Sequence, residues 1–544
     1  MVAALAGLGA CGTNASSGAS GTGGVPGASG TSAPISGTAG AKSGMASGSS
    51  GAGMAGMSGA SSGGTSGSGS GSAAGSPSGS VSASGDAGGP DSGGPSFDAS
   101  SASGAGAEAG SNTRDAAACT PGAPPSAQDG IVVDMPAPQG SPTYGASGFI
   151  YGIAQDGSEP PNPTLSDIKI QGLRVGGAQV GCPNGGYVNG QYAARWNVVK
   201  AYYAKAKAIG ARLLLLVHDL WGADGACNVP HYPGDGGDWT LYTSFINQVI
   251  GDAQANGMTG PDVRWELWNE PDLSIFWKGT QAQWLEMWMR GFQQIRAALP
   301  NAVLEGPSVA TGPGGSWASA FLDYVKTNAV VPDYVSWHEE GGGADPVADT
   351  TTMNAQLSKR GLTVSGLDAN EYGTSAEQNP GHSAWYLARF ERAGIEGLRG
   401  NWGEGPGLYE GMGALVTTAW QPDSQWWIYK RYADQTGLRS RVTAGMHTDA
   451  VAYQDASAAK AIVVVGNDGA VTGSVNVTFQ NIPAWLQSEG TTKVLVETMP
   501  TGNAALTAPS VVSSAAAPVT CNAMTVKINW TTATDGYVVT LTPP

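Results

Sequence analysis

Two glutamates stand where strand-like runs of the sequence end. Glu270 closes the run VRWELWNE and is followed at once by Pro271, and Glu371 lies near the end of GLTVSGLDANEYG. Alternation of side chains in the first run, and its stop at Pro271, predict a buried strand with a carboxylate at its carboxyl end. An isolated glutamate is usually a surface residue. A pair of carboxylates across a cleft is what glycoside hydrolysis requires, one to protonate the leaving oxygen and one to attack the anomeric carbon.

The elements that would position these glutamates form an alternation of strands and helices. Helical periodicity separates the strands, for example at Trp284, Trp288 and Phe292, and helices are expected at residues 198–209, 242–255, 317–327, 384–393 and 425–436. No G-x-G-x-x-G follows the first strand, so an open dinucleotide-binding sheet is disfavoured. An α/β fold with a (β/α)8 TIM barrel is predicted, since the carboxyl ends of its strands build the site. The expected strands are residues 148–154, 172–177, 212–218, 263–270, 303–308, 334–338, 362–372 and 397–402.

After about residue 440 the helical pattern gives way to short strands separated by turn residues, which predicts a C-terminal antiparallel β-sandwich domain. The extended segment 131–135, before the barrel, is a candidate for a further strand of this sandwich. The predicted domains are therefore a barrel at 119–440 and a sandwich at 441–544. The sandwich strands are expected at residues 451–454, 461–466, 474–479, 493–498, 525–530 and 537–541.

The N-terminal part of the chain has a different composition. Residues 12–118 consist almost entirely of Gly, Ser, Ala, Thr and Pro, so a disordered low-complexity tether is expected. Before it, Leu-Gly-Ala-Cys at residues 8–11 resembles the cleavage box of bacterial lipoproteins, which implies lipidation of Cys11 and export to the cell surface. Residues 1–11 are short and lack Lys and Arg, so we expect the true start to lie upstream. Gly12 after the cysteine favours the outer membrane in a diderm bacterium.

The cysteines suit an oxidising compartment. Without a lipidated Cys11, four cysteines remain, and four allow three pairings. We favour a disulfide between Cys182 and Cys227, because both fall in loops after consecutive barrel strands. Cys119 would then pair with Cys521 and tie the start of the ordered chain to its last domain.

Charge and composition restrict the partners. The net charge of −16 and the pI near 4.7 argue against nucleic acid and against an anionic membrane surface. Seventeen Trp and seventeen Tyr residues favour sugars, whose apolar faces stack on aromatic rings. His231, Asp235 and Asp238 lack a metal-ligand pattern, no nucleophile elbow of the G-x-S-x-G type follows a strand, and no cofactor is expected.

The motif around the first glutamate resembles a known clan. Asn-Glu-Pro at the fourth strand, with a glutamate ending the seventh, is similar to the retaining glycoside hydrolases that have a (β/α)8 barrel. WELWNEPDLSIFWKGTQAQW, GPS at 306–308, VSWH at 335–338 and the appended sandwich most resemble glycoside hydrolase family 39, the family of β-xylosidases and α-L-iduronidase. The likeness extends over about residues 140–544.

The resemblance implies roles for individual residues. Glu270 would be the general acid/base and Glu371 the nucleophile, with Asn269 hydrogen-bonded to the sugar 2-hydroxyl. Apolar surroundings such as Trp268 would keep Glu270 protonated, whereas Glu371 needs a cation to stay ionised. Arg174, which ends the second strand, is the candidate cation, and clan members place an arginine there; the alternative is an ordinary ion pair at the barrel end.

Further contacts to the sugar are expected at the strand ends. His338 would touch the sugar or Glu371, and Tyr372 is a candidate substrate contact. Trp221 and Trp402 are candidate sugar platforms, with core packing as the alternative. Family members often carry Tyr two residues after this histidine, but here the residue is Glu340, which is a rival carboxylate.

These observations favour an exported, lipid-anchored retaining glycosidase, with an exo-acting β-xylosidase on plant-type polysaccharide fragments as the first candidate. The long loops after strands two and three depart from typical xylosidases, so an α-L-arabinofuranosidase or a β-glucuronidase is a close alternative. The rivals from other classes are a non-catalytic carbohydrate-binding lipoprotein and a surface-display protein, for which the tether would be the functional part.

Overall fold

The computed structural model describes the barrel, the sandwich and most of the loops between them. Its described residues are 119–181, 185–224, 229–341, 343–400 and 411–544. The predictions for Cys11, residues 12–118, Cys182, Cys227 and Trp402 lie outside the described residues.

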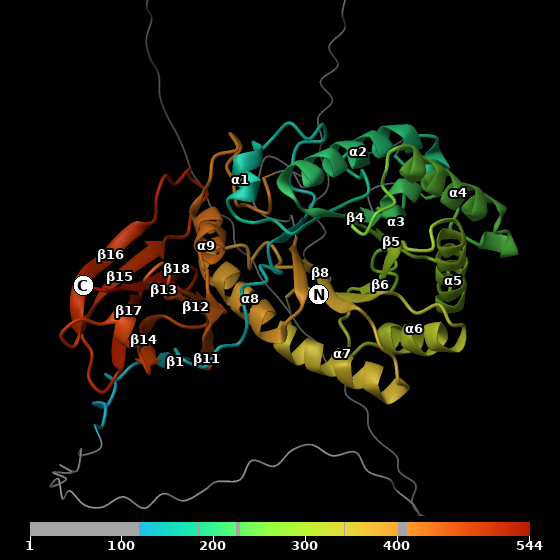
Figure 1. Ribbon diagram of the computed structural model, residues 1–544. Helices are drawn as coiled ribbons and strands as arrows, with labels where there is room; N and C mark the ends of the chain where they lie inside the picture. Colours follow the sequence, from blue (N-terminus) through green and yellow to red (C-terminus); the bar gives the residue numbers. More distant parts are fainter. Residues whose placement is uncertain (1–118, 182–184, 225–228, 342, 401–410) are drawn as a thin grey trace, which may run out of the picture. The chain divides into compact units, whose positions relative to one another are not determined.

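Eight parallel strands form a closed barrel, which confirms the predicted fold (Figure 1). The barrel closes because β2 pairs with both β3 and β9. Each strand overlaps one of the runs expected from the sequence. The strands are β2 (Gly148–Ile150), β3 (Gly172–Val175), β4 (Arg212–Leu216), β5 (Val263–Glu266), β6 (Val303–Val309), β7 (Tyr334–Glu339), β8 (Gly366–Tyr372) and β9 (Glu396–Arg399).

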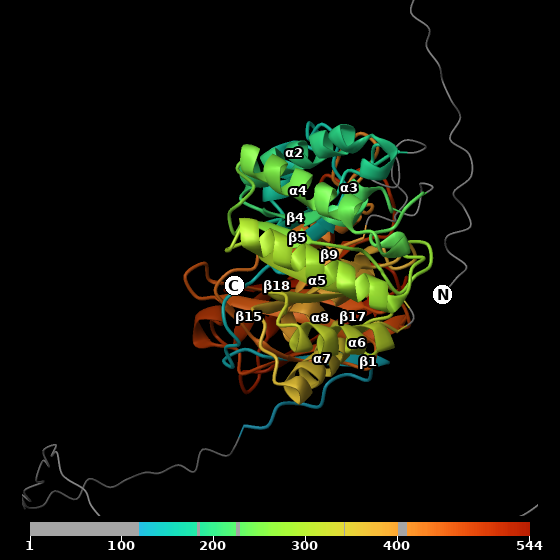
Figure 2. The same cartoon turned by 90° about the vertical axis from the view of Figure 1, so that its right-hand side faces the viewer.

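Helices follow the strands and cover the outside of the barrel, where α4, α5 and α6 lie next to one another (Figure 2). An Asn or Asp side chain caps the amino end of three of them, at Asn379, Asp345 and Asp423. The helices are α1 (Asn162–Ser166), α2 (Tyr192–Ile209), α3 (Val217–Trp221), α4 (Thr240–Ala255), α5 (Gln281–Ala298), α6 (Ser316–Thr327), α7 (Pro346–Arg360), α8 (Pro380–Ala393) and α9 (Ser424–Ala433), with short 3-10 turns at Tyr187–Asn189, Asp235–Gly237 and Ala484–Leu486.

The two faces of the barrel strands differ sharply in polarity. In β5, Val263 and Trp265 belong to the apolar layer between strands and helices. Arg264 and Glu266, on the opposite face, are buried and form ion pairs with residues of other barrel strands. Because successive side chains of a strand point to opposite faces, the interior of this barrel carries charge.

The sandwich consists of two sheets around a separate apolar core that includes Val133, Val463, Val477 and Val539. One sheet has the order β11-β1-β14-β17, and the other has the order β10-β12-β13-β18-β15-β16. β1 precedes the barrel in the chain, yet it lies between β11 and β14, as segment 131–135 suggested. The strands are β1 (Asp129–Asp134), β10 (Leu438–Arg439), β11 (Arg441–Thr443), β12 (Thr448–Asp455), β13 (Lys460–Asn467), β14 (Gly473–Gln480), β15 (Thr491–Met499), β16 (Ser510–Pro518), β17 (Met524–Trp530) and β18 (Gly536–Thr542).

Helix α8 joins the barrel to the sandwich (Figure 1). Its backbone packs directly on β13 at Gly466, where an added Cβ would lie 2.0 Å from the Trp385 nitrogen. Arg389 and Arg392 of the same helix donate to Asp449 of β12, which is fully buried. The barrel and the sandwich therefore share a tightly packed boundary.

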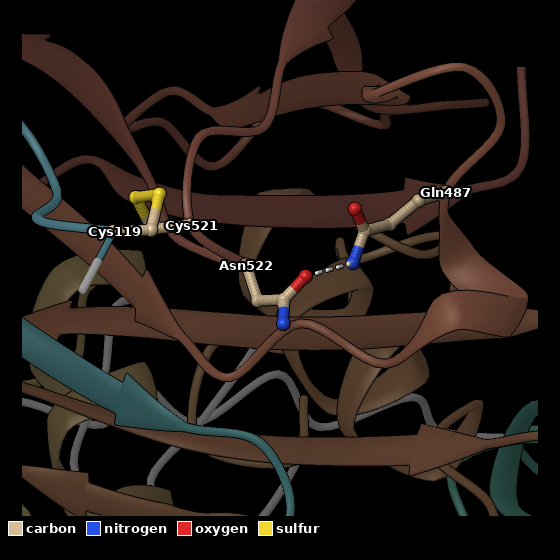
Figure 3. The surroundings of a disulfide bond; sticks show 4 residues. All are labelled: Cys119, Gln487, Cys521 and Asn522. Carbon is tan, nitrogen blue, oxygen red and sulfur yellow. Dashed lines mark hydrogen bonds between the residues drawn. A yellow bond between two sulfur atoms is a disulfide. The ribbon is translucent and has the colours of Figure 1, made fainter. Parts of the chain in front are cut away.

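The predicted disulfide between Cys119 and Cys521 is present (Figure 3), with Cα atoms 5.4 Å apart. The bond links Cys119, which precedes β1, to the turn between β16 and β17. In the same turn, Asn522 accepts a hydrogen bond from the Gln487 side chain at 3.1 Å. The described helices include none long and apolar enough to cross a membrane.

Candidate active site

Glu270 and Glu371 meet at the carboxyl end of the barrel strands. Glu371 lies within β8. The sequence predicted that Glu270 ends the strand before it, but β5 already ends at Glu266, so Glu270 belongs to the turn that follows. The N–H of Glu270 donates to the Ser308 carbonyl at 2.9 Å, which fixes this turn against β6. Both side chains are buried, and one oxygen of each lies within 4.8 Å of the other.

Arg174 of β3 organises the floor of the site. Its side chain is completely buried, and its Nε and Nη2 donate to the two carboxylate oxygens of Glu266 at 2.6 Å each. Nη2 also donates to Asn269 Oδ1 at 2.5 Å, and Nη1 donates to Glu371. The predicted cation beside Glu371 is therefore in place. This fork of charge-assisted bonds fixes the orientation of both Glu371 and Asn269.

His338 of β7 connects the two glutamates. Its Nδ1 lies 2.9 Å from Glu270 Oε1 and 3.5 Å from Glu371 Oε2. Burial lowers the pKa of His338, and the charge of Glu371 opposes that shift. A neutral imidazole that bridges the two carboxyl groups can hold their relative position without adding a full charge.

Burial sets the protonation of both glutamates. It raises the pKa of Glu270 to about 8, an effect to which Asp272 adds and which Arg174 opposes. It likewise raises the pKa of Glu371 to about 8, against the opposing charges of His338 and Arg174. The positive charge of Arg174 thus does not offset the effect of burial on the pKa of Glu371. Since Arg174 donates directly to Glu371, the ionised form is favoured on Glu371 and the proton on Glu270.

Two predicted sugar contacts lie away from this site. Trp221 is 1 % exposed and packs against Tyr187, Tyr242 and Phe245, so its ring faces are covered by protein. The cause is helix α3, which begins directly after β4 and turns Trp221 into the layer outside the barrel. The structure therefore corrects the prediction of a sugar platform there in favour of core packing.

Tyr372 is the second correction. It is fully buried, and its hydroxyl donates to the Ala146 carbonyl at 2.8 Å and hydrogen-bonds the Tyr429 hydroxyl at 2.6 Å. Its ring packs on Tyr386 and Phe390 of α8. Because it follows Glu371 in the same strand, the alternation of side chains sends it to the opposite face of β8.

Sequence reasoning missed Glu266 and Asp272. Glu266 pairs with Arg174, and the alternation that places Arg264 inside the barrel places Glu266 there too, so charged residues at inward positions were the available signal. Asp272 accepts hydrogen bonds from the backbone of Ala310 and Thr311 at 3.0 and 2.9 Å, and it thereby holds the turn that carries Glu270.

One group of donors converges among the described residues: Glu270, His338, Glu340 and Glu371 each place a ligand atom within 4.8 Å of the others. Three carboxylates with an imidazole are chemically able to hold a divalent cation. Asp235 and Asp238, in the loop after α3, are engaged in local hydrogen bonds instead. Asp235 accepts from the Tyr232 backbone and from Gln283, and Asp238 accepts from the Thr240 backbone, so these two carboxylates hold their own loops.

Comparison with known proteins agrees with this geometry. The profile of glycosyl hydrolases family 39 matches residues 260–361, a range that includes Asn269, Glu270 and His338. This part of the chain therefore resembles the family 39 glycoside hydrolases. A 3-O-alpha-D-galactosyl-alpha-L-arabinofuranosidase of Bifidobacterium longum subsp. longum is 24 % identical over 396 residues, which are 64 % of this chain. The chain spans about a third of that relative, 34 % of its length.

Solved structures share the fold over 76 % of this chain. The structure of N2152 from Neocallimastix frontalis is 23 % identical, is covered over its full length and superposes with a TM-score of 0.63. A GH39 enzyme from Xanthomonas axonopodis pv. citri is 14 % identical, with 97 % of its chain covered and a TM-score of 0.52. A monomeric β-xylosidase from Caulobacter crescentus CB15 is 16 % identical, with 99 % of its chain covered and a TM-score of 0.52.

Proposed function

We propose that this chain is a glycoside hydrolase that works by double displacement with retention, using Glu371 as nucleophile and Glu270 as general acid/base. The observation that carries the proposal is the approach of the two buried carboxylates to within 4.8 Å. Retaining glycosidases hold their carboxyl groups about 5–5.5 Å apart, whereas inverting enzymes leave about 6.5–9.5 Å for a water molecule.

The residues around the pair fit these roles. In the first step, Glu371 attacks the anomeric carbon while Glu270 passes its proton to the leaving oxygen. In the second step, Glu270 takes a proton from water, and that water releases the sugar from Glu371. Arg174 holds the Glu371 carboxylate and Asn269 in fixed positions. Asn269 is thereby presented for a hydrogen bond to the sugar 2-hydroxyl, which strengthens in the transition state.

For the substrate, the first candidate is a terminal β-linked xylose, released in exo fashion from plant-type polysaccharide fragments. The names of fold neighbours support it, since they include a β-xylosidase. The second candidate is an α-L-arabinofuranoside, which the arabinofuranosidase relative favours. Both are neutral pentosides, so the two candidates require the same chemistry at Glu270 and Glu371.

The test is hydrolysis of aryl β-xyloside, α-L-arabinofuranoside, β-glucoside, β-galactoside and β-glucuronide by the full chain and by Glu371→Ala. We expect release from a pentoside that is abolished in the variant. A 2-deoxy-2-fluoro analogue of that substrate should add one glycosyl mass to a peptide containing Glu371. Inverted product or label on another residue would refute the mechanism, and no release from any substrate would favour a carbohydrate-binding protein.

We also propose that Cys11 anchors the enzyme through lipid at a bacterial surface. The support is the sequence alone, Leu-Gly-Ala-Cys followed by the Gly/Ser-rich segment. A wild-type chain expressed behind a lipoprotein signal should partition with membranes and detergent, and Cys11→Ser should be released to the aqueous phase. Equal partitioning of both chains would contradict the anchor.

A further inference from the structure

A third carboxylate stands beside the catalytic pair. Glu340 follows β7 directly, two positions after His338, and it is partly exposed where Glu270 and Glu371 are buried. Its ligand oxygen lies within 4.8 Å of those of both glutamates and of the His338 ring nitrogen. A sugar whose anomeric carbon reaches Glu371 therefore has its hydroxyls close to Glu340.

The charge of Glu340 reaches the nucleophile. After burial, which is the largest cause, Glu340 and Glu270 are the groups that raise the pKa of Glu371. Asp272 and Glu266 add further negative charge around Glu270. The cation at this place, Arg174, already donates to Glu266, Asn269 and Glu371. A carboxylate on the substrate would thus meet negative charge in a site where burial weakens solvent screening.

We propose that Glu340 is a specificity-determining residue that selects neutral, hydroxyl-rich sugars and rejects uronates. An ionised carboxylate accepts hydrogen bonds from two sugar hydroxyls at once and binds them more strongly than a neutral acceptor does. The same charge repels the carboxylate of a glucuronide or an iduronide. The inference rests on the proposed glycosidase function, and it excludes the uronidase alternative for this chain.

The position of Glu340 in the strand supports this role. His338 faces the site, and Glu339 faces away from it, where the Trp337 indole donates to its carboxylate at 2.7 Å. Alternation therefore returns Glu340 to the side of His338. Glu340 is the first residue after β7 and is partly exposed, so a sugar that enters from solvent can reach its carboxylate.

The test compares wild type, Glu340→Gln and a control, Glu286→Gln, which removes a carboxylate from the exposed face of α5. On the pentoside that wild type cleaves, we expect Glu340→Gln to raise KM roughly tenfold, because a neutral amide replaces a charged acceptor, while kcat changes little. The control should keep both constants. An unchanged KM in a folded Glu340→Gln variant would overturn the proposal.

The second measurement uses wild type alone and does not depend on the variant folding. Aryl β-glucoside and β-glucuronide differ only at C6, so their kcat/KM ratio reports the response to charge. We expect the glucuronide to be the poorer substrate, and a glucuronide cleaved better than the glucoside or the pentosides would refute the selection against uronates. A chain that cleaves none of the glycosides would instead overturn the underlying glycosidase function.

Discussion

The backbone of Glu270 is unusual for a residue with a side chain. Its φ is +38°, in the left-handed region that L-residues other than Gly, Asn and Asp seldom occupy. Such a conformation costs on the order of 1–3 kcal/mol and persists where surrounding contacts impose it. Here the hydrogen bond from the Glu270 N–H to the Ser308 carbonyl, and those that Asp272 accepts from Ala310 and Thr311, hold the turn in place. In this turn the Glu270 carboxylate lies 2.9 Å from the His338 ring nitrogen.

Replacing Glu270 with Gln should separate the two catalytic steps. Without a proton donor, we expect cleavage of a glycoside with a poor leaving group to slow roughly 10²–10⁴-fold. An aryl glycoside with a good leaving group should lose less in its first step, because its departure needs little protonation. Steady-state and burst kinetics on a series of aryl glycosides would measure this, and an equal loss across the series would remove Glu270 from the acid role.

The pH dependence of kcat/KM should report the protonation of Glu270 and Glu371. Activity requires Glu270 protonated and Glu371 ionised, and the pKa of each is raised to about 8 by burial. We expect kcat/KM to form a bell centred near pH 8, higher than ordinary carboxyl groups would give. As pH rises, activity falls because Glu270 loses its proton, so the alkaline limb should vanish in Glu270→Gln. An alkaline limb that survives would belong to another group.

The sequence predicted a site residue correctly where its type suits the chemistry and the order of the strands already places it at the site. Glu371 and Arg174 end barrel strands, so parallel topology alone brings their side chains together. Trp221 and Tyr372 were misassigned because their positions depend on which face a side chain takes, and one residue of offset reverses it. The presence of helix α3 directly after β4 is a packing outcome that periodicity over a few residues does not reveal.

At the scale of single elements, helix α8 connects the barrel to the sandwich. The Asn379 side chain accepts a hydrogen bond from the His382 backbone at 3.0 Å and caps the helix. We expect Asn379→Ala to lower the free energy of unfolding by about 1 kcal/mol, with Asn379→Asp retaining most of it. Urea denaturation measures both. Equal stability of Asn379→Ala and wild type would show that the cap contributes nothing.

Strand β8 should respond to pH through Asp368, which lies inside the barrel. Burial, with Glu396 adding to it, raises its pKa to about 7. The folded state thus binds this proton more tightly than the unfolded chain, so the free energy of unfolding should fall as pH rises from about 4 to about 7. Asp368→Asn should show a smaller fall between about pH 4 and 7 in urea denaturation. The exposed control Asp167→Asn should behave as wild type, and identical slopes in all three would refute the prediction.

Elements with strong periodicity were predictable, and elements with weak patterns, such as α7 and β16, were not. Helix α7 contains three consecutive threonines, Thr350 to Thr352, whose β-branching lowers helix propensity, and its formation relies on packing and on the Asp345 cap. Strand β16 is built of Ser, Val and Ala and is exposed along most of its length, so no alternation marks it. Its pairing with β15 defines it.

At the scale of the molecule, the Cys119–Cys521 disulfide closes a loop over a sequence separation of 402 residues. Cross-links over long loops restrict the unfolded chain, and losing one costs about 2–4 kcal/mol. We expect Cys119→Ser/Cys521→Ser to unfold at a correspondingly lower temperature. Reductant should destabilise wild type by at least the same amount. A double variant as stable as oxidised wild type would show that the bond is dispensable.

Strand β1 is far in the chain from the other strands of its sheet. It lies inside the first sheet of the sandwich, parallel to β14, although the whole barrel intervenes between the two in the chain. During synthesis, β1 leaves the ribosome first and must wait for some 340 residues before its partner at Gly473–Gln480 exists. In the chain, the barrel lies between β1 and all the other strands of the sandwich, so a cut at either barrel boundary would separate β1 from its sheet. Shuffling either module into another protein requires carrying both ends of the chain together.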